Sequence, residues 1–173
     1  MHRRLFLLLF FIISGCGYTT SGCMYSGKKI IVKPVVNKMK ITSENREYAN
    51  FETFPILIEN KLTNMLVRKF NSDGNLKVVS QGSDALQLNC TVSNYTKESL
   101  SYENGNDVEE QRLRLVTHII FTDAKGEVLQ DKSIQGETTY YLTGTGATSE
   151  IAARDALIDD TAKRIVESIT EEW

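Results

Sequence analysis

Leu86-Gln87-Leu88-Asn89-Cys90-Thr91-Val92-Ser93 alternates strictly between apolar and polar side chains. Successive side chains of a β-strand point to opposite faces, so this period predicts a strand with one buried face and one solvated face. A second alternating run follows, with one face formed by Leu113, Leu115, Thr117, Ile119 and Phe121 and the other by Arg112, Arg114 and His118. Because the polar segment Asn104-Gly105-Asn106-Asp107 separates the two runs, they predict a hairpin with a long tip.

Two other segments have the period of helices. From Phe54 onward, apolar residues recur at steps of three and four and share one face: Ile58, Leu62, Met65, Leu66 and Phe70. Pro55 suits the first turn of this helix, and Asn71-Ser72-Asp73-Gly74 ends it. Near the C-terminus, Ser149 is a credible N-cap, and Glu150 favours the dipole of a second helix. One face of that helix is formed by Ile151, Ile158, Ala162, Ile165 and Ile169.

The remaining β-branched segments complete the predicted sheet. Lys29 to Val36 is a first strand, in which Pro34 indicates an edge or a strand end because proline cannot donate to a ladder. Leu76 to Val79 is a short strand, and Glu127 to Tyr141 is a longer one, with a possible break near Gly136. This order of elements predicts an α+β domain with two helices packed on one face of a mostly antiparallel sheet of about four strands.

The N-terminus has the layout of an export signal. A basic start at residues 1–4 precedes an apolar block of about nine residues, whereas roughly 20 are needed to cross a bilayer. We therefore expect residues 1–15 to be a cleaved signal peptide. Residues 16–28 are rich in Gly, Ser and Thr and suit a tether, and residues 29–173 form a single domain.

Ile13-Ser14-Gly15-Cys16 looks like a lipobox, in which the thiol of Cys16 receives a diacylglycerol and the new amino terminus an acyl chain such as palmitate. The alternatives are that Cys16 merely follows an ordinary signal peptide, or that the apolar block is a core segment. Residue 17 is Gly rather than the Asp that resembles an inner-membrane retention signal. We expect a lipid-anchored protein on the periplasmic side of the cell outer membrane, with no cofactor besides the covalent lipid.

Two further cysteines remain, in a compartment that permits disulfides. Cys90 lies on the apolar side of its strand, where a lone cysteine usually acts as a small hydrophobe. Cys23 lies in the expected tether. Whether the two form a disulfide stays open.

The sequence gives little support for catalysis. His118 is the only histidine after the leader, so neither a histidine metal cluster nor a Ser-His-Asp triad has a second candidate. Gly144-Thr145-Gly146-Ala147 lacks the lysine of a phosphate loop. Of the 20 basic residues, Arg3 and Arg4 lie in the leader, which leaves 18 against 22 acidic residues and no reason to expect nucleic-acid binding. We expect no enzyme, and a lipid-anchored hydrolase is the weakest hypothesis.

A polar surface near the hairpin is the remaining candidate for binding. Lys97, Arg112 and Arg114 could meet anionic sugar or phosphate groups through charge-assisted hydrogen bonds. The alternative is an ordinary solvated sheet face. Four tyrosines are equally compatible with interface anchors or with packing on the sheet: Tyr95, Tyr102, Tyr140 and Tyr141.

The order of short motifs resembles a known family. These motifs are Ser14-Gly15-Cys16-Gly17-Tyr18, Ile31-Val32-Lys33-Pro34-Val35-Val36-Asn37, Leu86 to Tyr95 running into Ser99-Leu100-Ser101-Tyr102, Gly126-Glu127-Val128-Leu129, and Tyr140-Tyr141 before the terminal helix. From Cys16 to Trp173 the chain resembles the LptE (RlpB) family of lipopolysaccharide-assembly lipoproteins. The resemblance rests on the order and spacing of these motifs rather than on any one signature.

The resemblance implies an outer-membrane lipoprotein that plugs the LptD β-barrel, assists its assembly and helps to deliver lipopolysaccharide to the cell surface. Only Cys16 carries over residue by residue. The implied partners are an LptD-like barrel, lipopolysaccharide and the membrane through the anchor. The competing hypothesis is a lipoprotein that regulates a periplasmic peptidoglycan synthase or secretion complex. A tether of about twelve residues spans at most roughly 40 Å, which favours a partner at the membrane.

Overall fold

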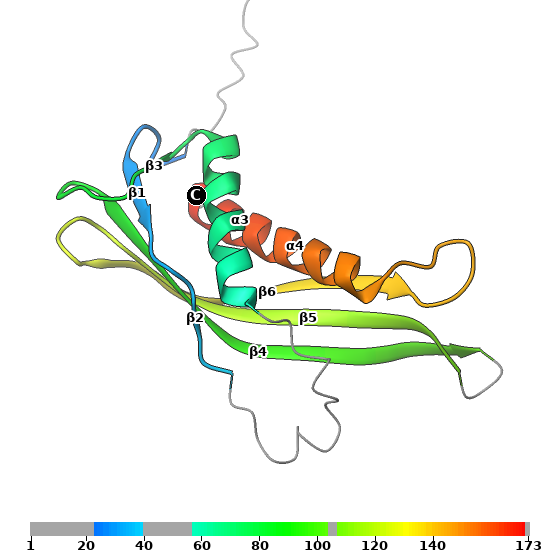
Figure 1. Cartoon of the computed structure of the whole chain (residues 1–173). Helices are drawn as coiled ribbons and strands as arrows, with labels where there is room; N and C mark the ends of the chain where they lie inside the picture. Colours follow the sequence, from blue (N-terminus) through cyan, green and yellow to red (C-terminus); the bar gives the residue numbers. More distant parts are fainter. Residues whose placement is uncertain (1–22, 40–56, 104–106, 172–173) are drawn as a thin grey trace, which may run out of the picture.

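The computed structural model describes residues 23–39, 57–103 and 107–171. Two helices lie on the same side of a long, twisted sheet (Figure 1). The strands are β1 (Lys29–Val32), β2 (Val36–Asn37), β3 (Lys77–Val78), β4 (Leu86–Glu103), β5 (Asp107–Thr122) and β6 (Val128–Tyr141), and the helices are α3 (Ile58–Asp73) and α4 (Glu150–Thr170).

The sheet is mixed and has six strands, in the order β3-β1-β4-β5-β6 with β2 beside β4. The pairs β4–β5 and β5–β6 are antiparallel, whereas β1 and β2 pair parallel with β4, and β1 pairs parallel with β3. The expected α+β class and the two helices on one face are confirmed. The expectation of a mostly antiparallel sheet of about four strands is wrong, because the short N-terminal strands add parallel pairs that their own sequence does not encode.

The segment expected as one strand from Lys29 to Val36 is two strands. Lys33, Pro34 and Val35 separate β1 from β2, and both strands lie along the same partner, β4. Pro34 therefore marks a strand end, where its missing amide costs no ladder hydrogen bond. The strand before it, β1, lies between β3 and β4, whereas the strand after it, β2, pairs with β4 alone.

The β4–β5 hairpin is longer than its alternating pattern indicates. Its pairing continues beyond Val92, across a register shift between Val92 and Asn94, as far as the pair Glu103 and Asp107. The expected faces of β5 are confirmed, because all five side chains of the apolar face are fully buried: Leu113, Leu115, Thr117, Ile119 and Phe121. The strand after the next turn is continuous through Gly136 rather than broken there.

The helices bury the faces that their period predicts, with one exception. Ile58, Leu62, Leu66 and Phe70 of α3 are buried, and Gly74 ends the helix in the left-handed conformation. In α4, Ser149 is the N-cap, and its side chain accepts a hydrogen bond from the amide of Ala152. The expected buried position of Ile151 is wrong, because its side chain is 68% exposed. The start of the first helix at Phe54 and Pro55 lies outside the described residues.

The chain is folded from Cys23 onward, ahead of the first strand. The amide of Gly27 donates to the carbonyl of Asn75 at 2.8 Å, which ties this turn to the segment before β3. Tyr25 packs edge-on against the ring of Phe121, with ring centroids 5.3 Å apart. Residues 23–28 therefore form an ordered turn on the domain.

Candidate functional site

The three basic candidates lie in the half of the β4–β5 hairpin that is remote from β1 and β3 (Figure 1). Lys97 on β4 pairs in register with Leu113, whose side chain is buried, so Lys97 lies on the face that carries the helices. Arg112 and Arg114 flank Leu113 on β5 and therefore point to the opposite face. We call that opposite face the open face. Cys16 lies outside the described residues, and its lipidation stays a prediction.

Lys97 is held by the start of α4. Its ammonium lies 2.7 Å from a carboxylate oxygen of Glu150, and Arg154 also hydrogen-bonds Glu150. Burial raises the pKa of Glu150, but the hydrogen bonds and charges of Lys97 and Arg154 outweigh that effect and bring the pKa below its ordinary value. Lys97 thus joins β4 to the first turn of α4 through a partly buried ion pair.

The four tyrosines fall into two groups. Tyr95 and Tyr140 lie on the helix side, where the hydroxyl of Tyr140 donates to the amide oxygen of Gln111 at 2.5 Å. Burial raises the pKa of Tyr140 to about 12 and also raises that of Tyr95. Tyr102 and Tyr141 are 56% and 45% exposed. The first two are packing residues, and the second two are available to a partner.

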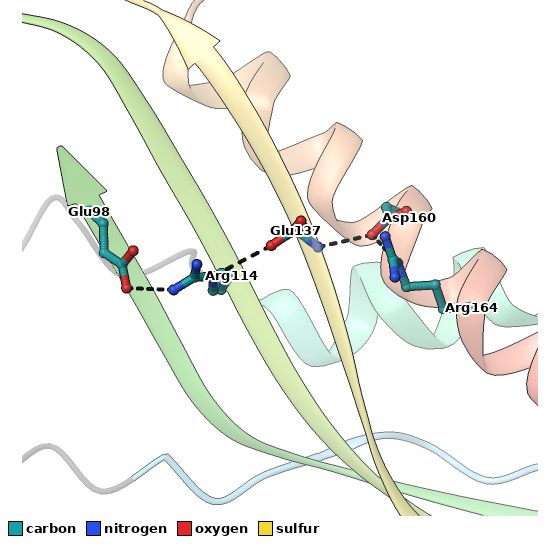
Figure 2. Close-up of polar contacts among 5 residues, drawn as sticks. All are labelled: Glu98, Arg114, Glu137, Asp160 and Arg164. Atoms are coloured by element: carbon teal, nitrogen blue, oxygen red, sulfur yellow. Dashed lines mark hydrogen bonds and ion pairs between the residues drawn. The ribbon is translucent and has the colours of Figure 1, made fainter. Parts of the chain in front are cut away.

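Arg114 is enclosed by charges on the open face (Figure 2). Its guanidinium lies 2.7 Å from a carboxylate oxygen of Glu98 on β4 and 3.5 Å from one of Glu137 on β6. The backbone amide of Glu137 donates to Asp160 of α4 at 2.9 Å, and Arg164 donates to the same carboxylate at 2.7 Å. This row of five residues links β4, β5, β6 and α4, and it occupies Arg114 with partners inside the chain.

Arg112 differs from both of the other candidates. Within the described residues it has no hydrogen bond or ion pair, and its Nε atom is buried without a partner. Its register neighbours are Glu98 on β4, which is already paired with Arg114, and Thr139 on β6. A buried guanidinium donor without an acceptor is costly, so an anionic ligand that reaches this position would gain a hydrogen bond that the protein itself does not supply.

Apolar side chains are exposed around the same end of the molecule. They are Leu100 and Tyr102 on β4, Tyr141 and Leu142 at the end of β6, and Ile151 in the first turn of α4. These five are half of the exposed large hydrophobic residues in the described part of the chain. Tyr141 shares the open face with Arg112, two residues along β6 from the register partner of that arginine. Arg112, which has no ion-pair partner among the described residues, and the exposed Tyr141 could together bind a ligand that has both an anionic and an apolar part.

The remaining polar candidates among the described residues are His118 and the two cysteines. His118 pairs with Asp131 across β5 and β6 at 2.7 Å, on the open face and half exposed. Among the described residues there is no group of three His, Cys, Asp or Glu side chains that could hold a metal ion, nor a helix long and apolar enough to cross a membrane. Cys23 and Cys90 are both free thiols, and Cys90 is buried as the alternation predicted.

Sequence reasoning found the three cations but missed what surrounds them. Glu98 and Glu137 form ion pairs with Arg114, and Glu150 forms one with Lys97, although each carboxylate lies on another strand or helix. The period of the last strand could have indicated that Glu137 and Tyr141 share a face. The register between strands decides whether that face is the open face, and it also decides which arginine lies opposite Glu137.

Comparisons with known proteins find one family model and several similar solved structures. Residues 38–172 match the family model described as LptE, lipopolysaccharide-assembly. The structure of a minor lipoprotein from Acinetobacter baumannii is similar at a TM-score of 0.52 and 20% identity, covering 83% of this chain and 93% of that one. The rare lipoprotein B from Shewanella oneidensis gives a TM-score of 0.49 at 14% identity, covering 82% and 94%. No curated protein matches the sequence.

Proposed function

The chain belongs to the LptE lipopolysaccharide-assembly family, and from this premise we propose that it is an outer-membrane lipoprotein, anchored through acyl chains on Cys16. It binds inside or against an LptD-like β-barrel, supports the assembly of that barrel and helps to deliver lipopolysaccharide to the cell surface. It acts by binding rather than by catalysis. Membership of the family supports a role in lipopolysaccharide assembly, and the barrel partner, the anchor and the ligand site are the proposal's own additions.

The unpartnered Arg112 is the observation that carries the ligand site. Lipopolysaccharide combines phosphate groups with acyl chains, and a guanidinium binds phosphate through two parallel hydrogen bonds. The exposed apolar side chains Leu100, Tyr102 and Tyr141 lie at the same end of the sheet. Lys97 and Arg114 are the weaker candidates, because a ligand would have to displace Glu150, Glu98 or Glu137 from them.

A binding measurement with purified lipopolysaccharide tests this assignment. Arg112→Ala is expected to weaken binding by about 10-fold or more, the loss of one charge-assisted hydrogen-bonding group. Arg112→Lys keeps the charge without the paired donors and should recover only part of the affinity. Lys163→Ala, an exposed change of equal charge on α4, is the control. Equal binding by Arg112→Ala and the control would exclude this site.

The anchor and the partner have separate tests. Cys16→Ala should abolish labelling with palmitate and release the protein from the membrane fraction, and retention of the label would refute lipidation at this residue. Crosslinking in the native envelope, followed by purification in detergent and mass spectrometry, should recover a large β-barrel in near-equal amount. Recovery of a peptidoglycan synthase or a secretion component without a barrel would support the competing hypothesis instead.

A further inference from the structure

The charge of the chain is divided unevenly along its length. Residues 16–43 contain five lysines and no acidic residue, namely Lys28, Lys29, Lys33, Lys38 and Lys40. All 22 acidic residues of the protein therefore lie in residues 44–173, together with 13 basic ones. The mature protein is acidic as a whole, but the part that follows the proposed lipidation site is cationic.

Backbone hydrogen bonds fix the start of this cationic segment to the residues around β3. The amide of Gly27 is bound to the carbonyl of Asn75, and the amide of Lys77 to the carbonyl of Lys28, at 2.8 and 2.9 Å. Lys28 and Lys77 are therefore neighbours through the backbone, although the register partner of Lys77 is Lys29. Neither Lys28 nor Lys77 has an ion pair among the described residues, and the Lys28 ammonium lies 5.4 Å from the centroid of the Tyr25 ring. Lys29 is next to both lysines but is neutralised by Asp84 at 3.0 Å.

An exposed apolar side chain belongs to the same turn. Met24 is 70% exposed, the most exposed of the large hydrophobic residues in the described part of the chain. The turn that carries it is fixed by the hydrogen bond from Ser26 to the carbonyl of Cys23 and by the packing of Tyr25 on Phe121. Met24, Lys28 and Lys77 together form what we call the anchor-proximal surface.

The length of the chain before this surface limits its distance from the lipid. Only residues 17–22 separate Cys16 from Cys23, so seven extended residues span at most about 25 Å. The tether is short enough for this surface to reach the membrane, and a lysine within about 10 Å of anionic phospholipids gains roughly fivefold in partitioning. An exposed methionine beside such a lysine can enter the apolar side of the interface.

We propose that the anchor-proximal surface rests on the anionic phospholipid face of the membrane that holds the acyl chains. The proposal relies on lipidation of Cys16 and adds an orientation to it. The end with β1 and β3 faces the lipid, and the tip of the β4–β5 hairpin at the opposite end points away from it (Figure 1). The acyl chains attach the protein to the membrane, and Met24, Lys28 and Lys77 determine how the domain is oriented relative to it.

The test supplies the anchor chemically, so that it does not depend on bacterial lipidation. The mature chain with Cys23→Ser is coupled through Cys16 to a maleimide phospholipid on vesicles that contain phosphatidylglycerol, and Cys90 is buried and does not compete. In a Trp173→Phe background, a tryptophan is placed either near the anchor by Met24→Trp or near the hairpin tip by Tyr102→Trp. Lipids brominated on their acyl chains quench whichever tryptophan lies at the membrane.

The expected result is strong quenching at position 24 and little at position 102. Lys28→Gln with Lys77→Gln should reduce the preference for this orientation by about 25-fold, and added salt should act in the same direction. Lys61→Gln with Lys163→Gln, of equal charge on α3 and α4, should change nothing. Equal quenching at both positions, or no effect of Lys28 and Lys77, would overturn the orientation. Either result leaves the lipidation of Cys16 to its own palmitate test.

Discussion

Gly136 lies where α4 packs tightly against β6. A Cβ atom at this position would lie 2.1 Å from the hydroxyl oxygen of Thr161 and 2.8 Å from its Cα atom. Gly136→Ala should therefore lower the free energy of unfolding by about 1–3 kcal/mol, the usual cost of overpacking. Chemical denaturation monitored by circular dichroism measures this change.

The contact with Thr161 also provides the control for that prediction. Gly136→Ala combined with Thr161→Ala should recover part of the loss, because only the clash with the hydroxyl is removed and the clash with Cα remains. Gly146→Ala, where the nearest atom is a ring carbon of Tyr141 at 3.7 Å, should stay within about 0.5 kcal/mol of the parent. A Gly136→Ala protein as stable as the parent would mean that α4 does not pack this closely.

Cys90 predicts how stability depends on alkaline pH. Burial raises the pKa of its thiol from 9.0 to about 12. The unfolded chain therefore loses this proton at a lower pH than the native protein, so the stabilisation is complete below pH 9 and is lost as the pH rises towards 12. Thermal unfolding between pH 8 and 11 should show a falling Tm, and the fall should be smaller in Cys90→Ala.

Thiol labelling checks the same burial independently. In the native protein Cys23 should react with an alkylating reagent, whereas Cys90 should react only after unfolding. Rapid labelling of Cys90 under native conditions would contradict its buried position on β4.

At the scale of the elements, Asp160 protects the edge of the sheet. β6 is an edge strand, and the carboxylate of Asp160 accepts a hydrogen bond from the backbone amide of Glu137 (Figure 2). Asp160→Ala should lower stability by about 1 kcal/mol and speed hydrogen exchange at the Glu137 amide, because that donor is then left to water. Exchange followed by NMR at this one amide measures the effect.

Removal of another carboxylate from α4 is the control for the hydrogen bond between Asp160 and Glu137. Glu167 makes only an exposed pair with Lys163 at 3.6 Å, so Glu167→Ala should leave both stability and exchange at Glu137 unchanged. If the two variants exchange alike at Glu137, Asp160 does not cap the edge.

The elements also show how far the sequence could predict this fold. The strict alternation from Leu86 to Val92 and the helical period of α3 identified their buried faces correctly, since each pattern depends only on local spacing. Ile151 was misplaced because its spacing matches that of Ile158, although its own position is exposed. The ion pairs between α3 and α4, Lys61 with Asp155 and Lys69 with Asp159, lie further along α4. The local period predicts on which face of a helix a side chain lies, but whether that side chain is buried depends on which other elements pack there.

The candidate site was predictable to the same extent. The alternation on β5 placed Arg112 and Arg114 on one face, but it could not show that Arg114 has ion-pair partners and that Arg112 has none among the described residues. The distinction depends on Glu137, the register partner of Arg114 on β6, and on Glu98, which lies opposite Arg112 on β4 but pairs diagonally with Arg114. Register between strands far apart in the sequence is a property of the assembled sheet.

At the scale of the whole molecule, the helices cover only part of a long hairpin. The pairing of β4 with β5 continues to Glu103 and Asp107, but residues 98–100 of β4 are exposed. Between Leu113 and Phe121 of β5, by contrast, every second side chain is fully buried. Backbone hydrogen bonds without a packed cover open by local fluctuation, and those over the core open only with global unfolding. The domain therefore has a stable half beside the helices and a less stable half at the proposed binding end.

Hydrogen exchange should reveal this gradient directly. In the isolated domain, amides of residues 98–102 and 108–111 should exchange at least about tenfold faster than those of residues 86–92 and 115–121, because local opening costs less than unfolding. If the distal half is the surface that a barrel or lipopolysaccharide contacts, adding either one should slow exchange there and leave the core unchanged. Slowing confined to the helices, with the distal strands unaffected, would move the binding surface away from Arg112 and Tyr141.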